Sequence, residues 1–289
     1  MIRRNYFSIA ISYILLGLGT IVVLLPFVVM ISTSLTPVNE VFAWPPKLIP
    51  SKLMFRNYPD AIKAIDFGRY YLNSVIITCT ATVISLALNS AAGYALAKLR
   101  FPGKKIAFLF ILGTIMIPVQ VTMIPVFIMF RKFPFAGGNN FFGQGGIGLI
   151  DSYLALILPN MATTMGIYLL REFFKSLPNE LLQAARVDGS SEYRTFFEIC
   201  LPLSGPGLIA SGIFNFTNSW NDFLWPLIMT VTPKMRTIQL GLSQYQGQYF
   251  TDWHLMMAAT LMSCLPILVL YCIFQKGFVE GISSTGIKG

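Results

Sequence analysis

Six long apolar stretches, separated by segments that hold nearly all of the charge, limit what this chain can fold into. The stretches cover residues 9–31, 73–97, 106–130, 152–170, 206–230 and 255–275, and Asp222 is the one acidic or basic residue inside them. Each has 19 to 25 residues, about the length that a helix needs to cross roughly 30 Å of hydrocarbon. They lack a period of two, which excludes barrel strands. The sequence therefore predicts an all-α, polytopic membrane protein with six transmembrane helices.

The composition supports a chain embedded in a lipid bilayer. Hydrophobic residues make up 55% of the sequence and charged residues 11%, whereas a soluble domain has about 25% charged residues. This excludes a disordered chain, a nucleic-acid module and an ordinary cytosolic enzyme. The net charge of +9 is assigned to loops that orient the chain, not to a nucleic-acid partner. The scattered cysteines and the single histidine, His254, predict neither a disulfide framework nor a zinc site.

The distribution of basic residues predicts the orientation. With a cytoplasmic N-terminus, 12 of the 21 lysines and arginines fall in 65 inner residues and nine in 86 outer residues, the inner segments being 1–8, 98–105, 171–205 and 276–289. Because basic residues are enriched in cytoplasmic loops, both termini are predicted to be cytoplasmic. The first apolar run lacks an A-x-A cleavage site, which favours a retained span over a signal peptide.

Prolines recur inside the predicted spans. They are Pro26, Pro118, Pro125, Pro159, Pro226 and Pro266. Each removes a backbone donor and frees a carbonyl, which lipid tolerates only where other protein groups or water satisfy it. Two interpretations stay open: the prolines kink the helices for packing, or the bent helices line a cavity.

The longest inner segment, residues 171–205, carries the strongest local signals. Ser176 is a candidate N-cap, Pro178 suits a first helical turn, and Gly189 suits the position after a helix end. A second helix is expected from Ser190 or Ser191 to Leu201, before Pro202. The segment is therefore predicted to form two short helices joined at a tight turn, and we call residues 171–205 the elbow segment.

The elbow segment resembles the EAA motif of the permease subunits of ATP-binding-cassette importers. That motif reads E-A-A, three residues, glycine, nine residues and I-x-L-P. Here Gln183-Ala184-Ala185 is followed at the same spacing by Gly189 and by Ile199-Cys200-Leu201-Pro202, with Gln183 in place of the motif's glutamate. The resemblance implies that an ATPase docks on this segment, through Gln183, Ala184, Ala185, Asp188, Gly189, Ser190, Ile199, Leu201 and Pro202.

Shorter matches narrow the resemblance to carbohydrate importers of the maltose type. They include Asn57-Tyr58, Asn73-Ser74, residues 101–104, residues 220–227 and the final residues 286–289. The resemblance implies one transmembrane domain over 1–289 with a five-span core at 73–275, in the inner membrane of a prokaryote. It also implies four kinds of partner: a second homologous permease, two ATPase subunits, an external solute-binding protein and a carbohydrate.

The expected chain is not an enzyme. It lacks the G-x-x-x-x-G-K-[ST] phosphate loop, so no cofactor is expected here, and ATP and Mg belong to the partner ATPases. Closure of those ATPases would move the spans by alternating access. An intramembrane enzyme is the first alternative, but Asp222 has no acidic partner in a span. An ion channel or ion-coupled carrier is the second, and it generally needs more intramembrane charge.

A polar stripe in the fifth run is the candidate substrate pathway. Ser211, Asn215, Asn218 and Asp222 follow one another at intervals of four, three and four residues, which places them on one face of a continuous helix. Trp220 or Trp225 could stack on a sugar. Polar groups at membrane depth face either a solvated path or a neighbouring helix, and both interpretations stay open.

Overall fold

The computed structural model describes residues 6–44, 48–247 and 251–286. Within these residues the chain is helical and contains no strand, which confirms the predicted all-α class. It divides into two compact units, one of residues 1–68 and 241–265 and the other of residues 69–240 and 266–289.

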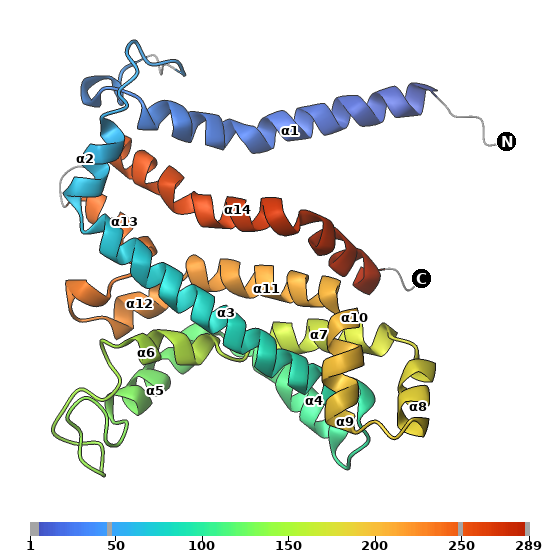
Figure 1. Cartoon of the computed structure of the whole chain (residues 1–289). Coiled ribbons are helices and arrows are strands. Elements are labelled where there is room, and N and C mark those ends of the chain that lie inside the picture. Colours follow the sequence, from blue (N-terminus) through green and yellow to red (C-terminus); the bar gives the residue numbers. More distant parts are fainter. Residues whose placement is uncertain (1–5, 45–47, 248–250, 287–289) are drawn as a thin grey trace. The chain divides into compact units, whose positions relative to one another are not determined.

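The longer helices belong to the predicted apolar runs (Figure 1). The α-helices are α1 (Tyr6–Ser34), α2 (Asn57–Ala64), α3 (Phe67–Lys98), α4 (Lys104–Gly113), α5 (Val119–Arg131), α6 (Tyr153–Ile157), α7 (Thr164–Ser176), α8 (Asn179–Val187), α9 (Glu192–Thr195), α10 (Leu201–Leu203), α11 (Gly205–Trp220), α12 (Leu224–Met229), α13 (Ile238–Leu242) and α14 (Trp253–Gly286). A π-helical turn, Phe196–Cys200, joins α9 to α10.

The predicted six spans are matched in number when bent helices are counted as one. Three helices are long and apolar enough to cross a membrane unbroken: Ile11–Ser34, Phe67–Lys98 and Trp253–Gly281. Three further pairs of helices are long and apolar enough only when taken together, and each pair is bent, by 102° between Lys104–Met116 and Val119–Arg131, by 40° between Tyr153–Asn160 and Thr164–Ser176, and by 78° between Glu192–Leu203 and Gly205–Trp220.

The predicted apolar runs 106–130 and 206–230 each contain a helix break. The first breaks before Pro118, which lacks the N–H that an unbroken helix would need. The second ends at Trp220, and α12 starts only at Leu224. Hydropathy could not reveal either break, because an apolar stretch reads the same whether its helix is straight or bent.

In the first unit, polar side chains fasten α2 to the end of α1. The amide of Asn57 donates to the carbonyl oxygens of Ser34 (2.9 Å) and Thr36 (3.1 Å), which supplies partners to groups that a helix end leaves free. The hydroxyl of Tyr245 donates to the carbonyl oxygen of Ala61 at 2.7 Å. Burial raises the pKa of Tyr245 to about 12, so this phenol stays protonated and keeps donating.

The second unit contains two apolar clusters. One is built around Leu156, Trp225 and Met229, and the other around Tyr94, Phe174 and Cys200. Glycines allow the helices around the second cluster to approach closely. An added Cβ at Gly93 would lie 3.0 Å from the backbone nitrogen of Arg171, and one at Gly207 would lie 2.7 Å from the Phe173 ring. This packing fixes α7 between α3 and α11.

Candidate functional site

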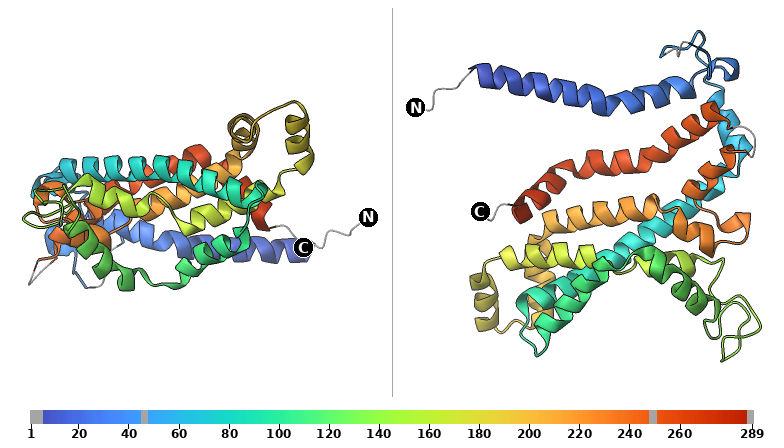
Figure 2. Two further views of the ribbon diagram at one scale, coloured as in Figure 1. Left: turned by 90° about the horizontal axis from the view of Figure 1, so that it is seen from below. Right: turned by 180° about the vertical axis from the view of Figure 1, so that it is seen from behind.

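The elbow segment forms two helical arms joined by a glycine turn (Figure 2). Gly189 has φ +77°; its N–H donates to the carbonyl oxygen of Arg186 (3.1 Å), and the N–H of Ser190 donates to that of Ala185 (2.9 Å). These two bonds make a Schellman motif, in which glycine adopts the left-handed conformation at little cost. Ser191 then caps the second arm by accepting from the N–H of Arg194. The predicted turn is confirmed, whereas Ser176 ends α7 instead of capping α8.

The motif residues divide between an outer and an inner face. Gln183, Ala184, Asp188, Gly189 and Pro202 are exposed, Ser190, Ile199 and Leu201 are partly exposed, and Ala185 is buried. The exposed set also includes Val187, whose side chain is 87% exposed. The exposed face of the first arm therefore combines apolar and polar side chains. Because Ala184 has a small side chain, another protein surface can approach the arm closely at this position.

A relay of polar contacts ties both arms to α3. Glu192 accepts from the hydroxyl of Tyr94 at 2.8 Å and pairs with Arg186 at 2.9 Å. Its carboxylate thereby links α3, the second arm and the first arm. Lys98, at the end of α3, donates to the carbonyl oxygen of Leu177 (2.7 Å) and to the side chain of Asn179 (2.8 Å), which fixes the start of α8.

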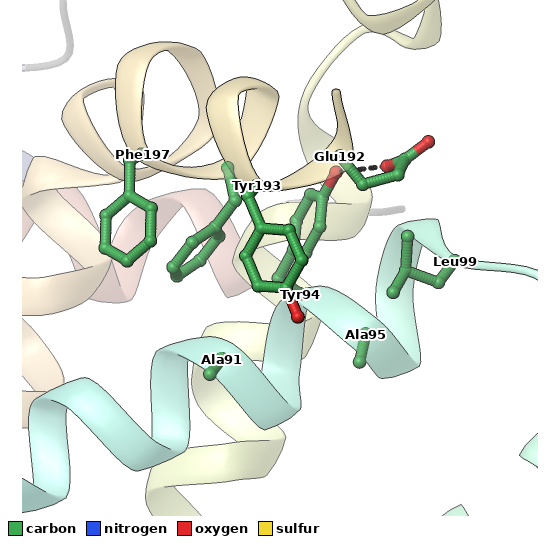
Figure 3. A pocket seen from close by; sticks show the side chains of 8 residues that line it. Ala91, Tyr94, Ala95, Leu99, Glu192, Tyr193 and Phe197 are labelled. Atoms are coloured by element: carbon green, nitrogen blue, oxygen red, sulfur yellow. Dashed lines mark hydrogen bonds between the residues drawn. The ribbon is translucent and has the colours of Figure 1, made fainter. Parts of the chain in front are cut away.

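Aromatic packing reinforces this attachment. The ring of Phe174 lies edge-on to Tyr94 at 5.8 Å and near Phe196 at 6.2 Å. Beside these rings, a hollow of about 290 Å³ separates α3 from the second arm, and Tyr193 and Phe197 line its outer side (Figure 3). The arms are therefore held as one body against the end of α3, through an aromatic core and one carboxylate.

The polar stripe of the fifth run is only partly on a helix. Ser211 and Asn215 are buried in α11, and Asn218 is exposed. Asp222 lies beyond the end of α11 at Trp220, so the prediction of one helical face through Asp222 is wrong. Its carboxylate instead accepts from the backbone N–H of Trp225 at 3.2 Å, at the start of α12.

The two tryptophans named as stacking candidates are packed within the unit. Trp220 is 1% exposed, with the Phe216 ring stacked on it at 5.8 Å and Tyr71 edge-on at 5.5 Å. Trp225 is also buried and donates to the carbonyl oxygen of Ala155 at 2.8 Å. In this structure both indoles stabilise the helix packing.

A small cavity adjoins the stripe. It has a volume of about 60 Å³, and its lining includes Thr163, Ser211, Asn215 and Asn218. Among the described residues, Ser211 Oγ and Asn215 Oδ1 are buried and find no hydrogen-bond partner, while the Asn215 amide nitrogen donates to the carbonyl oxygen of Ala81 at 3.4 Å. The stripe thus contacts both a neighbouring helix and a cavity of about the size that holds water.

Sequence reasoning missed several residues that hold the site together. Tyr94, Lys98 and Glu192 act across 79 to 98 positions, and the motif spacing gives no information at that range. Asn89 holds the break before α7, since it accepts from the N–H of Thr163 (3.1 Å) and donates to its hydroxyl (3.1 Å). The sequence signal for this structural role was the presence of a polar residue, Asn89, inside an apolar run.

Comparison with known proteins identifies the family. Residues 89–283, which include the elbow segment and the polar stripe, match the family described as binding-protein-dependent transport system inner membrane component. The chain belongs to this family. The resemblance inferred from the EAA-type spacing is thereby confirmed, and this transport component is placed among multi-pass inner membrane proteins.

Several relatives of this transport component are permeases by name. The diacetylchitobiose uptake system permease of Streptomyces coelicolor is 31% identical over 95% of this chain and 87% of its own. The sn-glycerol-3-phosphate transport system permease of Pectobacterium atrosepticum is 32% identical over 94% of each chain.

The fold also recurs in a solved structure. In a bacterial ABC transporter involved in the import of alginate, a chain superposes with a TM-score of 0.79 at 22% identity, covering 96% of this chain and 99% of that one. A second structure is a bacterial alginate transporter in complex with an alginate pentasaccharide-bound periplasmic protein. One of its chains matches with a TM-score of 0.64 at 12% identity, covering 94% of this chain and 96% of that one.

Proposed function

We propose that this chain is one of two permease subunits in an ATP-driven carbohydrate importer. It forms half of the translocation pathway with a second homologous permease, receives the sugar from an external solute-binding protein, and couples to two cytosolic ATPase subunits. ATP and Mg bind to those ATPases and not to this chain. The observation that carries the proposal is the elbow segment, a helix–turn–helix that is anchored on α3 and exposes its first arm.

The geometry of the elbow segment suits a lever. The two arms are held together by a Schellman turn, an aromatic cluster and the Glu192 contacts. A force applied to α8 would therefore be transmitted to α3 and α7. This argument requires the elbow segment, and with it both termini, to be cytoplasmic. ATPase closure would then rock the bent spans between inward- and outward-open states.

Carbohydrate is the substrate class that the relatives favour. They include permeases named for arabinooligosaccharides and diacetylchitobiose, and the structural neighbours belong to alginate transporters. Ser211, Asn215 and Asn218 supply hydroxyl and amide groups of the kind that sugars bind. A cysteine at Asn218 should react with an aqueous thiol reagent in one conformational state, and absence of labelling in every state would refute a solvated path at this position.

Replacement of Gly189 tests the coupling. An alanine at φ +77° costs about 1–2 kcal/mol, and the added Cβ meets no atom within 4 Å, so the change acts on the turn and not on packing. In proteoliposomes that contain the whole complex, Gly189→Ala should lower ATP-dependent uptake by about tenfold if docking needs this turn. Gly138→Ala is the matched control, since Gly138 has φ +84° and also has room for a Cβ, but it lies in the loop after α5.

Two results would overturn the proposal. If Gly189→Ala and Gly138→Ala had the same uptake and the same nucleotide hydrolysis as the unchanged complex, the elbow segment would not transmit force. A thermal-shift screen of the cognate binding protein tests the substrate class, and a binding protein that responded only to amino acids or metal ions would refute the carbohydrate assignment.

A further inference from the structure

Positive charge gathers where the turn after α3 meets α7. An open hollow of about 490 Å³ there is lined by Lys104, Lys105, Phe108, Leu109 and Arg171. A second hollow, of about 530 Å³, shares both lysines and adds Arg100. No acidic residue is among the described residues that line either hollow, so no carboxylate within the lining offsets the repulsion between these like charges.

Packing and an ion pair fix the position of the Arg171 side chain beside this hollow. Its guanidinium lies over the Phe108 ring, 3.7 Å from the centroid, and close packing of α3 at Gly93 fixes its backbone. One of its terminal nitrogens pairs with Glu172, which also pairs with Lys175 at 3.2 Å. Its Nε is buried and has no hydrogen-bond partner among the described residues. One carboxylate therefore serves two cations, and the charge of the guanidinium is only partly neutralised.

The two lysines differ in what they already bind. Lys104 donates to the carbonyl oxygens of Ala97 (3.1 Å) and Leu99 (2.8 Å) at the end of α3, which anchors its ammonium beside the hollow. Lys105 is exposed, and no hydrogen bond or ion pair is recorded for it within the described part of the chain. Its charge is free to meet an anion.

An apolar surface continues from the charged hollow along α4. Ile106, Leu109 and Phe110 are 62%, 65% and 75% exposed. They line a further hollow of about 430 Å³ that extends to Ile117 and has no charged residue in its lining. A cationic end followed by an apolar channel matches a ligand that has an anionic head and a hydrocarbon tail.

We propose that the α3–α4 turn and Arg171 form a binding site for an anionic phospholipid. The phosphate lies among Lys104, Lys105 and Arg171, and one acyl chain follows the apolar surface of α4. Guanidinium groups bind phosphate in a planar, two-point manner, and basic pockets between membrane helices bind lipid head groups in this way. A free phosphate would use the charged end alone and leave the α4 surface without a function.

Native mass spectrometry of the full chain, purified with the subunits that accompany it, tests the site. Phosphatidylglycerol and phosphatidylcholine with identical acyl chains are the probes, and wild-type protein should retain the anionic lipid in preference. Lys105→Gln should reduce that retention about fivefold, and Lys105→Arg should restore it. Lys276→Gln is the matched control, because Lys276 is an exposed basic residue of α14 outside the site, and it should change nothing.

Four results would overturn the proposal. They are equal retention of the two lipids, equal losses in Lys105→Gln and Lys276→Gln, displacement of the lipid by millimolar inorganic phosphate, and absence of any retained lipid because another subunit covers α4. The tail has its own test: Phe110→Ser should weaken retention of long-chain phosphatidylglycerol and not of a short-chain form. Equal effects on both would remove the acyl chain from α4.

Discussion

The elbow segment and the glycine loop, residues 132–152, lie at different ends of the same unit and are stabilised by different interactions (Figure 1). In the elbow segment, side chains such as Phe174 and Tyr94 form the contacts between regular helices. In the glycine loop, backbone segments approach one another closely, and the side chain of Asn139 binds backbone groups. The elbow segment is therefore expected to move as one body, whereas the shape of the glycine loop depends on local backbone geometry.

Asn139 organises the glycine loop. Its amide nitrogen donates to the carbonyl oxygens of Arg131 (2.9 Å) and Phe133 (3.0 Å), and its oxygen accepts from the N–H of Gly146 (2.9 Å). The glycines are needed for close approach, since a Cβ at Gly148 would lie 2.1 Å from the carbonyl oxygen of Phe130. At Gly189 an added Cβ meets nothing, so that turn requires glycine only for its dihedral angles.

Removal of the Phe174 ring should have the largest effect. Phe174 is fully buried between α3 and the second arm, and Phe→Ala changes in cores cost about 3–5 kcal/mol. Cys200, also fully buried in this cluster, is a built-in probe. In Phe174→Ala its alkylation should accelerate about 100-fold or more, as measured by peptide mass mapping.

Phe174→Leu is the control for this prediction. It keeps most of the volume and should cost less than about 1.5 kcal/mol, so the alkylation of Cys200 should change little. If Phe174→Ala left the rate unchanged, the aromatic cluster would not be what holds the arms to α3. Protease cleavage of the glycine loop should be the same in both variants, because no residue of the cluster around Phe174 lies there.

An alanine at Gly148 should have a smaller effect that is confined to the other end. The Cβ clash and the φ of +63° force the backbone to shift, at about 2–3 kcal/mol. Cleavage between residues 132 and 152 should accelerate while the alkylation of Cys200 stays constant. Gly138→Ala is the control, since its φ of +84° also lies in the left-handed region but its Cβ would lie at an ordinary 3.7 Å from the nearest atom. Equal cleavage of the two variants would show that the close approach at Gly148 does not stabilise the loop.

These two regions also mark how far sequence reasoning reaches. The elbow turn was predictable because a glycine directly after a helix is typical of a helix end, and this signal depends only on residues close in sequence. Positions 132–152 predict a glycine-rich loop but not its contacts, because Asp151 pairs with residues 80 positions away. The break before Pro118 has a local cause in the missing N–H of that proline, whereas the apolar run 206–230 gives no sign that α11 ends at Trp220.

Loss of the Tyr94 hydroxyl should weaken the elbow segment modestly. Tyr94→Phe removes the donor to Glu192 and keeps the ring, which should cost about 1 kcal/mol and speed the alkylation of Cys200 about fivefold. Tyr193→Phe serves as the control, because its side chain is 82% exposed and should not affect the rate. Equal rates in Tyr94→Phe and wild type would place the whole attachment in the aromatic packing.

The smallest effect is expected at Asp151, which clasps the glycine loop to the segment after α12. Its carboxylate accepts from the N–H groups of Val231 (2.9 Å) and Thr232 (3.0 Å) and from the Thr232 hydroxyl (2.7 Å). Burial alone would raise the pKa of Asp151, but these hydrogen bonds outweigh it and lower the pKa below its ordinary value. A lowered pKa in the folded chain means that the clasp stabilises fully above the ordinary carboxyl range, near pH 4, and is lost as the pH falls through the lowered value.

Thermal unfolding of wild type and Asp151→Asn between pH 3 and pH 7 measures this contribution. Asparagine tolerates the φ of +61° found at Asp151 but brings no charge. At pH 7 the wild type should therefore be more stable by on the order of 1 kcal/mol, and it should unfold at a slightly higher temperature. The difference should shrink as the pH falls below about 4. A difference that stayed constant over the whole range would show that the charge on Asp151 contributes nothing to the stability of the glycine loop.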